Sequence, residues 1–86
     1  QRMSKITDTF HLIIASVAQT YFDGAAAAVT LPGESGVFTV LPHHEAFVTT
    51  LKSGTVTIKE ADGGTKEIAI EGGVFECSPG RAVALL

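Results

Sequence analysis

The sequence predicts an all-β domain of about ten short strands in a two-sheet β-sandwich or flattened barrel, with no C-terminal helical domain. Three observations support this fold class. The 86 residues are too few for two independent cores. Short segments rich in β-branched and aromatic residues alternate with turns that contain glycine or proline. No segment carries a helical apolar period long enough for a helix, and so many strands need closure to cover their edges.

The first half of the chain begins with a segment, 10–17, that is apolar on both faces. This pattern predicts a strand covered on both sides, or covered on one side by a partner subunit. The alanines of 25–28 favour a helix, but one turn does not nucleate alone, so we expect a strand here. The expected elements are strands at 10–17, 19–22, 25–31 and 37–41, with turns at 23–24 and 32–36.

The second half begins at a corner, Pro42-His43-His44-Glu45, because proline cannot donate to a strand ladder. Beyond it, apolar and polar residues alternate cleanly on both sides of Asp62-Gly63-Gly64, which predicts a hairpin. The expected elements are strands at 46–51, 55–60, 65–70, 74–77 and 81–86, with turns at 52–54, 62–64, 71–73 and 78–80. Val56, Ile58, Ile68 and Ile70 are expected to face the same side.

Residues 10–86 are expected to form the sandwich domain, and residues 1–9 an N-terminal extension that is partly a tag or disordered. Arg2 and Lys5 precede an apolar run, as in a secretory signal, but Asp8 and His11 interrupt that run. No apolar stretch approaches the roughly 18 residues of a membrane-spanning helix. The sequence therefore predicts neither a signal peptide nor a transmembrane segment.

The composition excludes several classes of partner. The net charge is −3, and the six basic residues are scattered singly, so no basic stripe can follow a nucleic-acid backbone. Cys77 is the only cysteine, which rules out an intramolecular disulfide and a zinc site built on paired cysteines. We expect Cys77 to be a small buried hydrophobic residue.

The corner holds the only side-chain cluster with metal-ligand chemistry. His43, His44 and Glu45, together with His11, would suit a small metal-binding jelly-roll (cupin-like) enzyme or sensor. Neighbouring residues of a strand point to opposite faces, so His43 and His44 could converge on one ion only from a loop. An exposed or interface loop is the favoured interpretation.

No catalytic arrangement is visible in the sequence. None of the serines lies in a Gly-x-Ser-x-Gly elbow, and the segment 33–36 lacks the Gly-Lys-Ser/Thr ending of a phosphate loop. No pair of carboxylates is spaced for acid–base work. The sequence therefore predicts a protein that is not an enzyme and that has no catalytic residue, cofactor, metal or small-molecule substrate. A generic carbohydrate- or protein-binding β module is a third interpretation.

Six short motifs follow one another along the chain. They are Phe10-His11-Leu12, Gln19-Thr20-Tyr21-Phe22-Asp23-Gly24, the segment from Gly36 to His44, Leu51-Lys52-Ser53-Gly54, Gly72-Gly73-Val74-Phe75-Glu76 and Val83-Ala84-Leu85. In this order they resemble the N-terminal β-sandwich domain of the epsilon subunit of F-type ATP synthases, called delta in mitochondria. The family usually has glycine at the position of His43 and Ala-Pro at Glu45-Ala46, so this corner is bulkier.

The resemblance implies a non-catalytic central-stalk (rotor) subunit that links gamma to the membrane c-ring and couples ion transport to ATP synthesis. Such a subunit is peripheral, on the cytoplasmic or stromal face of the energy-transducing membrane, and meets the membrane only through the complex. ATP-responsive inhibition is not expected without the helical domain. Carried over by position, the c-ring contact comprises Glu34, Ser35, Val37, His43 and His44, whereas the gamma contact is not assigned.

Overall fold

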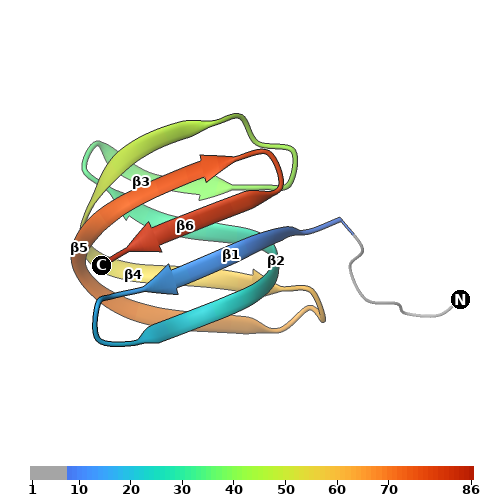
Figure 1. The fold of residues 1–86 in the computed structure, drawn as a ribbon, viewed down its shortest axis with the longest axis horizontal. Helices are drawn as coiled ribbons and strands as arrows, with labels where there is room; N and C mark the ends of the chain where they lie inside the picture. Colours follow the sequence, from blue (N-terminus) through green and yellow to red (C-terminus); the bar gives the residue numbers. More distant parts are fainter. Residues whose placement is uncertain (1–7) are drawn as a thin grey trace, which may run out of the picture.

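The computed structural model describes residues 8–86, which form strands, turns and loops (Figure 1). The strands are β1 (Phe10–Ala15), β2 (Thr20–Gly33), β3 (Gly36–Val40), β4 (Phe47–Glu60), β5 (Thr65–Ser78) and β6 (Arg81–Leu85). The all-β sandwich is confirmed, but the described residues form six strands rather than about ten. The expected extension, 1–9, lies outside the described residues except for Asp8 and Thr9, so that boundary stays a prediction.

The strands form a sheet that closes on itself. Its neighbour order is β1-β6-β5-β4-β2-β3, and β1 also pairs with β2, so five strands make a ring and β3 is attached to β2. The pairing of β1 with β6 is parallel, and the other pairings are antiparallel. In Figure 1, β4 and β5 curve round one side of the molecule from one layer to the other. Closure removes most of the free edges of an open sheet.

Three pairs of expected strands are single long strands. Segments 19–22 and 25–31 belong to β2, 46–51 and 55–60 to β4, and 65–70 and 74–77 to β5. The long strands bend where they pass from one layer of the sandwich to the other. At the bend, the alternation of core-facing and outward-facing side chains shifts by one residue. Leu51 and Val56 are both buried, as are Ile70 and Phe75, although each pair is separated by an odd number of positions. A break in this alternation beside glycine also occurs at a turn between two strands. The sequence pattern therefore does not distinguish a bend within one strand from a turn.

Glycine permits the bend in β5. Gly72 and Gly73 have φ values of 141° and 152°, a region that residues with a Cβ rarely adopt. A Cβ on Gly73 would overlap the carbonyl oxygen of Leu85 and lie 3.1 Å from the Cα of Leu86. The β4–β5 ladder keeps one register across the bend, from Phe47 opposite Cys77 to Lys59 opposite Thr65. The two strands therefore bend together rather than turning back.

The remaining connections are short. Pro32 and Gly33 belong to β2 and Gly36 to β3, so only Glu34 and Ser35 form the turn that was expected to span 32–36. The first strand ends at Ala15 rather than at residue 17 because Ser16 begins a turn. In that turn the Ser16 hydroxyl accepts hydrogen bonds from the N–H groups of Ala18 and Gln19. The alanine run lies in β2, as expected, with Ala26 fully buried.

A single apolar core fills the space between the layers. Its buried residues are Phe10, Leu12, Ile14, Ala26, Val29, Leu31, Val40, Leu51, Val56, Ile58, Ile70, Phe75, Cys77, Ala82 and Ala84. At one end the Phe75 ring packs against Phe38 and Phe47, with both centroid separations at 5.7 Å. The Phe38 contact ties β5 to β3, which is not its ladder neighbour, whereas Phe47 lies on β4, the strand that pairs with β5.

Cys77 belongs to this core and is 3% exposed. Burial raises the pKa of its thiol, the Glu76 carboxylate adds to the rise, and a backbone hydrogen bond at Phe47 opposes it. A thiol held protonated is a poor nucleophile, so Cys77 acts as the small buried hydrophobic residue expected from the sequence. Within residues 8–86, no helix is long and apolar enough to cross a membrane.

Candidate functional site

The five residues expected at the c-ring do not form one cluster. They lie before, within and after strand β3. Glu34 and Ser35 form the β2–β3 turn, and Val37 is the second residue of β3. His43 and His44 lie in the loop that follows the other end of β3. A strand of five residues is about 17 Å long, so the structure separates a turn group from a histidine loop. We call Glu34, Ser35 and Val37 the turn group, and residues 41–46 the histidine loop.

A groove of about 570 Å³ runs between β3 and the start of β4. Val37 and Phe38 line one side, and Phe47 and Val48 line the other. The ladder partner of β3 is β2, whereas the start of β4 pairs with β5, so two strand edges face each other across the groove. Val37 is 71% exposed and Val48 is 68% exposed. The groove therefore presents apolar side chains beside the turn group.

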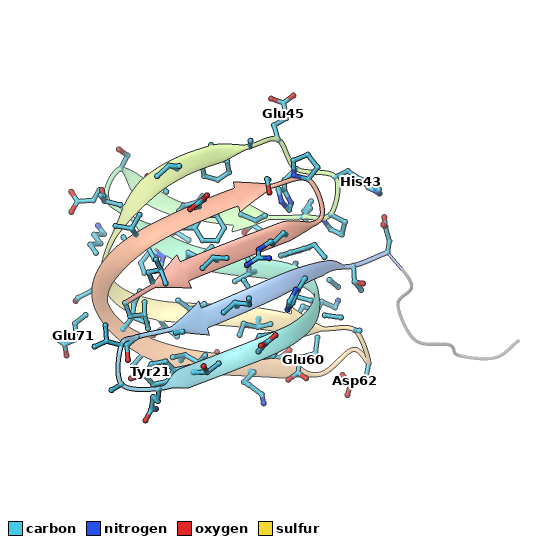
Figure 2. The ribbon with its side chains drawn as sticks, viewed as in Figure 1. Tyr21, His43, Glu45, Glu60, Asp62 and Glu71 are labelled. Atoms are coloured by element: carbon cyan, nitrogen blue, oxygen red, sulfur yellow. The ribbon has the colours of Figure 1, made fainter. Side chains whose placement is uncertain are left out.

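His43 has a left-handed backbone. Its φ of 70° is positive, which among the described residues is otherwise seen only for glycines. In the side-chain view, His43 and Glu45 project from the histidine loop away from the sandwich, and His43 Nε2 lies 3.0 Å from a carboxylate oxygen of Asp8 (Figure 2). The resemblance implies glycine at this position. The structure supplies the physical reason, because the turn requires a conformation that glycine adopts without steric cost.

Replacing His43 with glycine should stabilise the domain by about 0.5–1 kcal/mol. Glycine relieves a left-handed strain of roughly 1–2 kcal/mol, partly offset by its greater freedom in the unfolded chain. The contact with Asp8 is exposed and contributes little. Urea unfolding monitored by circular dichroism measures the change. The control is His43→Ala, which removes the same side chain but keeps the strain. Equal stability of the two variants would contradict the expectation.

His44 lies against the body of the molecule, unlike His43. Its Nδ1 is 2.8 Å from the carbonyl oxygen of Leu41, and its Nε2 is 2.7 Å from that of Ser78 and 3.3 Å from that of Arg81. The ring also stands edge-on to Phe10, with centroids 5.2 Å apart. These contacts join the histidine loop to the turn between β5 and β6.

The third histidine is placed elsewhere. His11 projects from β1, and its Nε2 lies 2.7 Å from Oδ1 of Asp23 on β2. The three histidines therefore have three separate sets of partners. Within residues 8–86, no group of three or more His, Cys, Asp or Glu side chains is placed to hold a metal ion. The metal-binding jelly-roll reading of His11, His43, His44 and Glu45 has no support in this arrangement.

The sequence interpretation did not single out a second surface, the outward side of β1, β6, β5 and the start of β4. Cross-strand register aligns its residues in two rows, Ala15–Leu85–Val74–Thr50 and Ile13–Val83–Glu76–Val48. We call this surface the outer face. Leu85 is 57% exposed and Val74 is 43% exposed, so the described chain leaves apolar area open to solvent. The signal in the sequence was the first strand, which is apolar on both sides.

Polar groups surround the apolar part of the outer face. Arg81 opposite Ser78 continues the face beyond the two rows, and the pair of His11 and Asp23 lies at its β1–β2 side. Exposed apolar area with charged groups around it is typical of a protein-binding surface, although here the exposed carboxylate of Glu76 also lies within the second row, between Val83 and Val48. A closed β-sandwich that exposes such a face and a polar loop belongs to the class of small β-sandwich binding domains.

Comparison with known sequences gives the family. Residues 9–85 match the family model described as ATP synthase, Delta/Epsilon chain, beta-sandwich domain. The chain belongs to this family.

Curated relatives agree with the family model. The ATP synthase epsilon chain of Bordetella petrii is 39% identical over 77 residues, which cover 90% of this chain and 55% of that protein. The ATP synthase epsilon chain of Delftia acidovorans is 36% identical over 78 residues, covering 91% and 56%. The chain therefore spans about half the length of the curated relatives it matches.

Solved structures show the same fold. A chain of the Euglena gracilis mitochondrial ATP synthase, from an OSCP/F1/c-ring structure, superposes with a TM-score of 0.84 at 21% identity, over 95% of this chain and 52% of that chain. A chain of the Tetrahymena thermophila mitochondrial ATP synthase, from a central stalk and c-ring structure, gives 0.71 at 15% identity, over 95% and 65%. At these identities the likeness concerns the fold.

Proposed function

We propose that the chain is a non-catalytic central-stalk (rotor) subunit of a rotary F-type ATP synthase. In this role it links the gamma subunit to the membrane c-ring and couples ion transport to ATP synthesis. The observation that carries the proposal is the family match over residues 9–85. The domain transmits torque and performs no chemistry itself. It is peripheral, on the cytoplasmic or stromal face of the membrane, and reaches the membrane only through the complex.

The proposed c-ring contact uses both ends of β3. Its support is positional, because Glu34, Ser35, Val37 and His43 are exposed and the groove between β3 and β4 lies beside the turn group. The Tetrahymena chain of the same fold comes from a central stalk and c-ring assembly. A contact made by all of these residues extends along about 17 Å of the domain, the length of β3.

The proposed gamma contact is the outer face. It has three exposed apolar residues, Val74, Leu85 and Val48, with the Glu76 carboxylate beside Val48 and further charged residues at its border. It also accounts for the apolar outward side of β1, where Ile13 and Ala15 face the same way as Leu85. A partner that covers this face removes its apolar area from water, which favours binding by about 25 cal/mol per Å² of apolar area buried.

Co-expression with the gamma subunit of the same source tests the proposed function. We expect the two chains to elute together in size-exclusion chromatography as a stable complex, because the outer face then becomes buried. Clean separation of the two chains at micromolar concentration would overturn the role in the central stalk. Metal analysis of the chain purified without an affinity tag tests the alternative, which requires a stoichiometric transition metal.

A further inference from the structure

We propose that the free edge of β3 pairs with the same edge of a second copy of this chain, which forms an antiparallel two-fold dimer. Strand β3 is last in the neighbour order and pairs with β2, so among residues 8–86 its other side has no strand neighbour. The open groove of about 570 Å³ lies along this side and leaves the edge accessible. The pairing is a property of the free chain and does not rest on the proposed function.

Three observations show which backbone groups of β3 point to the free edge. Opposed residues of an antiparallel ladder alternate between hydrogen-bonded and non-hydrogen-bonded pairs. Gly33 and Gly36 flank a two-residue turn and therefore form a hydrogen-bonded pair. Pro32, opposite Val37, has no N–H to exchange. The Thr39 hydroxyl lies 2.9 Å from that of its partner on β2, as in the closer non-hydrogen-bonded pairs. The N–H and C=O groups of Val37 and Thr39 therefore point away from β2.

The outward backbone groups of β3 are complementary to themselves. Val37 and Thr39 lie on either side of Phe38 in the strand. A two-fold axis at Phe38 therefore places Val37 of each copy opposite Thr39 of the other. Each of these two pairs exchanges two N–H···O=C bonds, as in an ordinary antiparallel ladder. Because the same edge is used on both sides, the assembly closes as a dimer and does not grow into a fibre.

The sequence of β3 does not protect this edge. Natural sheets keep free edges apart with charged side chains, prolines or bulges. Strand β3, Gly36-Val37-Phe38-Thr39-Val40, carries no charge and no proline, and its ladder with β2 has no register shift. The Phe38 ring packs against the rings of Phe47 and Phe75, which holds the strand in place before any partner binds. The edge is therefore preorganised for strand pairing.

Charge favours the antiparallel direction. The chain has a net charge of −3, and Glu34, in the turn before β3, is a charged residue close to the edge. In the antiparallel pair the two Glu34 residues are roughly 26 Å apart along the strands, well beyond a screening length of about 8–10 Å. A parallel pair would place the two carboxylates side by side. Repulsion between like charges therefore selects the two-fold arrangement.

The start of β4, across the groove, offers a shorter edge. The Glu34 N–H donates to the carbonyl oxygen of Thr50 at 3.0 Å, so this oxygen points away from β5 and is already occupied. By alternation, the backbone groups of Val48 also point away from β5. One residue supports a single pair, whereas β3 supports two. Pairing of β3 with β4 would also join unlike edges, which leads to open chains of molecules and not to a closed dimer.

Sedimentation equilibrium of the 86-residue chain tests the dimer. We expect a dissociation constant of about 0.1–1 mM, because two short strands form less than the roughly 1,200 Å² of a stable interface. Thr39→Pro removes an edge donor that the fold does not use, and edge strands tolerate proline. It should weaken association by about tenfold or more. Thr39→Val is the matched control, because it keeps the N–H and the β-branched shape, and should stay within about twofold of the wild type. Equal association of the two variants would contradict the proposal.

Nuclear magnetic resonance locates the contact in the same chain. Between about 0.05 and 2 mM, we expect the amide signals of Val37 and Thr39 to shift with concentration, whereas those of Val48 and Leu85 stay fixed. Val37→Lys provides a second variant in case Thr39→Pro does not fold, because Val37 is exposed and its replacement leaves the core intact. A lysine at the edge should abolish the concentration dependence. A monomer at about 2 mM, or shifts confined to Val48 or Leu85, would overturn the β3 dimer.

Discussion

Replacement of Gly73 by alanine is expected to destabilise the domain by about 3 kcal/mol or more. The added methyl group would overlap the backbone of β6 at Leu85, which cannot rotate away as a side chain does. The φ of 152° adds strain for any residue with a Cβ. Overpacking costs about 1–3 kcal/mol and backbone strain a similar amount. For a domain of this size the melting temperature should fall by roughly 12–24 °C, measurable by calorimetry.

Gly63 provides the matched control for this substitution. It also has a positive φ, 94°, but a Cβ there meets no atom within 4 Å. Gly63→Ala should therefore cost only the conformational strain, about 1 kcal/mol. If Gly73→Ala and Gly63→Ala lose the same stability, the close approach of β5 to β6 at the bend is not the cause of the loss in Gly73→Ala.

Replacement of Leu85 by glutamate should weaken binding of gamma about 100-fold, or about 2.7 kcal/mol. Leu85 is at the centre of the outer face, opposite Val74, and a carboxylate there would be buried without a partner in the complex. Because the side chain is 57% exposed in the free domain, stability should change by less than about 0.5 kcal/mol. Isothermal titration with purified gamma measures the affinity, and circular dichroism confirms folding.

Val37 distinguishes the two proposed contacts. It is exposed like Leu85 but lies on β3, in the turn group. Val37→Glu should leave the affinity for gamma unchanged and should reduce co-purification of the gamma-bound domain with the c-ring. An equal loss of gamma binding in both variants would show that the outer face is not a separate gamma contact.

The sequence is sufficient to place the hairpin of β4 and β5, because each strand alternates regularly on both sides of a glycine turn. Val56 lies opposite Ile68, as its inward alternation predicts. The sequence is not sufficient to distinguish a bend from a turn. At Ser53-Gly54 and Gly72-Gly73 the alternation shifts phase in either case, and only the partner strand shows that the ladder continues.

The candidate site is predictable in part for the same reason. Motif order locates the histidine loop, and the glycine usual at the position of His43 points to its positive φ. The separate environments of His43 and His44 come from Phe10, Ser78 and Arg81, which are distant in sequence. The outer face is equally non-local, because two ladders, β1–β6 and β5–β6, align Ile13, Leu85 and Val74 on one side. The spacing of residues within one segment does not reveal which distant strands pair with it.

The parallel pair of β1 and β6 sets the order in which the domain can fold. It joins His11 to Arg81 and Ala15 to Leu85, positions near opposite ends of the chain. Antiparallel neighbours such as β4 and β5 can form through a short turn, but this pair must close a loop that contains the other strands. Until β6 has been synthesised, a chain emerging from the ribosome therefore exposes the open sides of β1 and β5. During this period the chain is most prone to pair with another molecule.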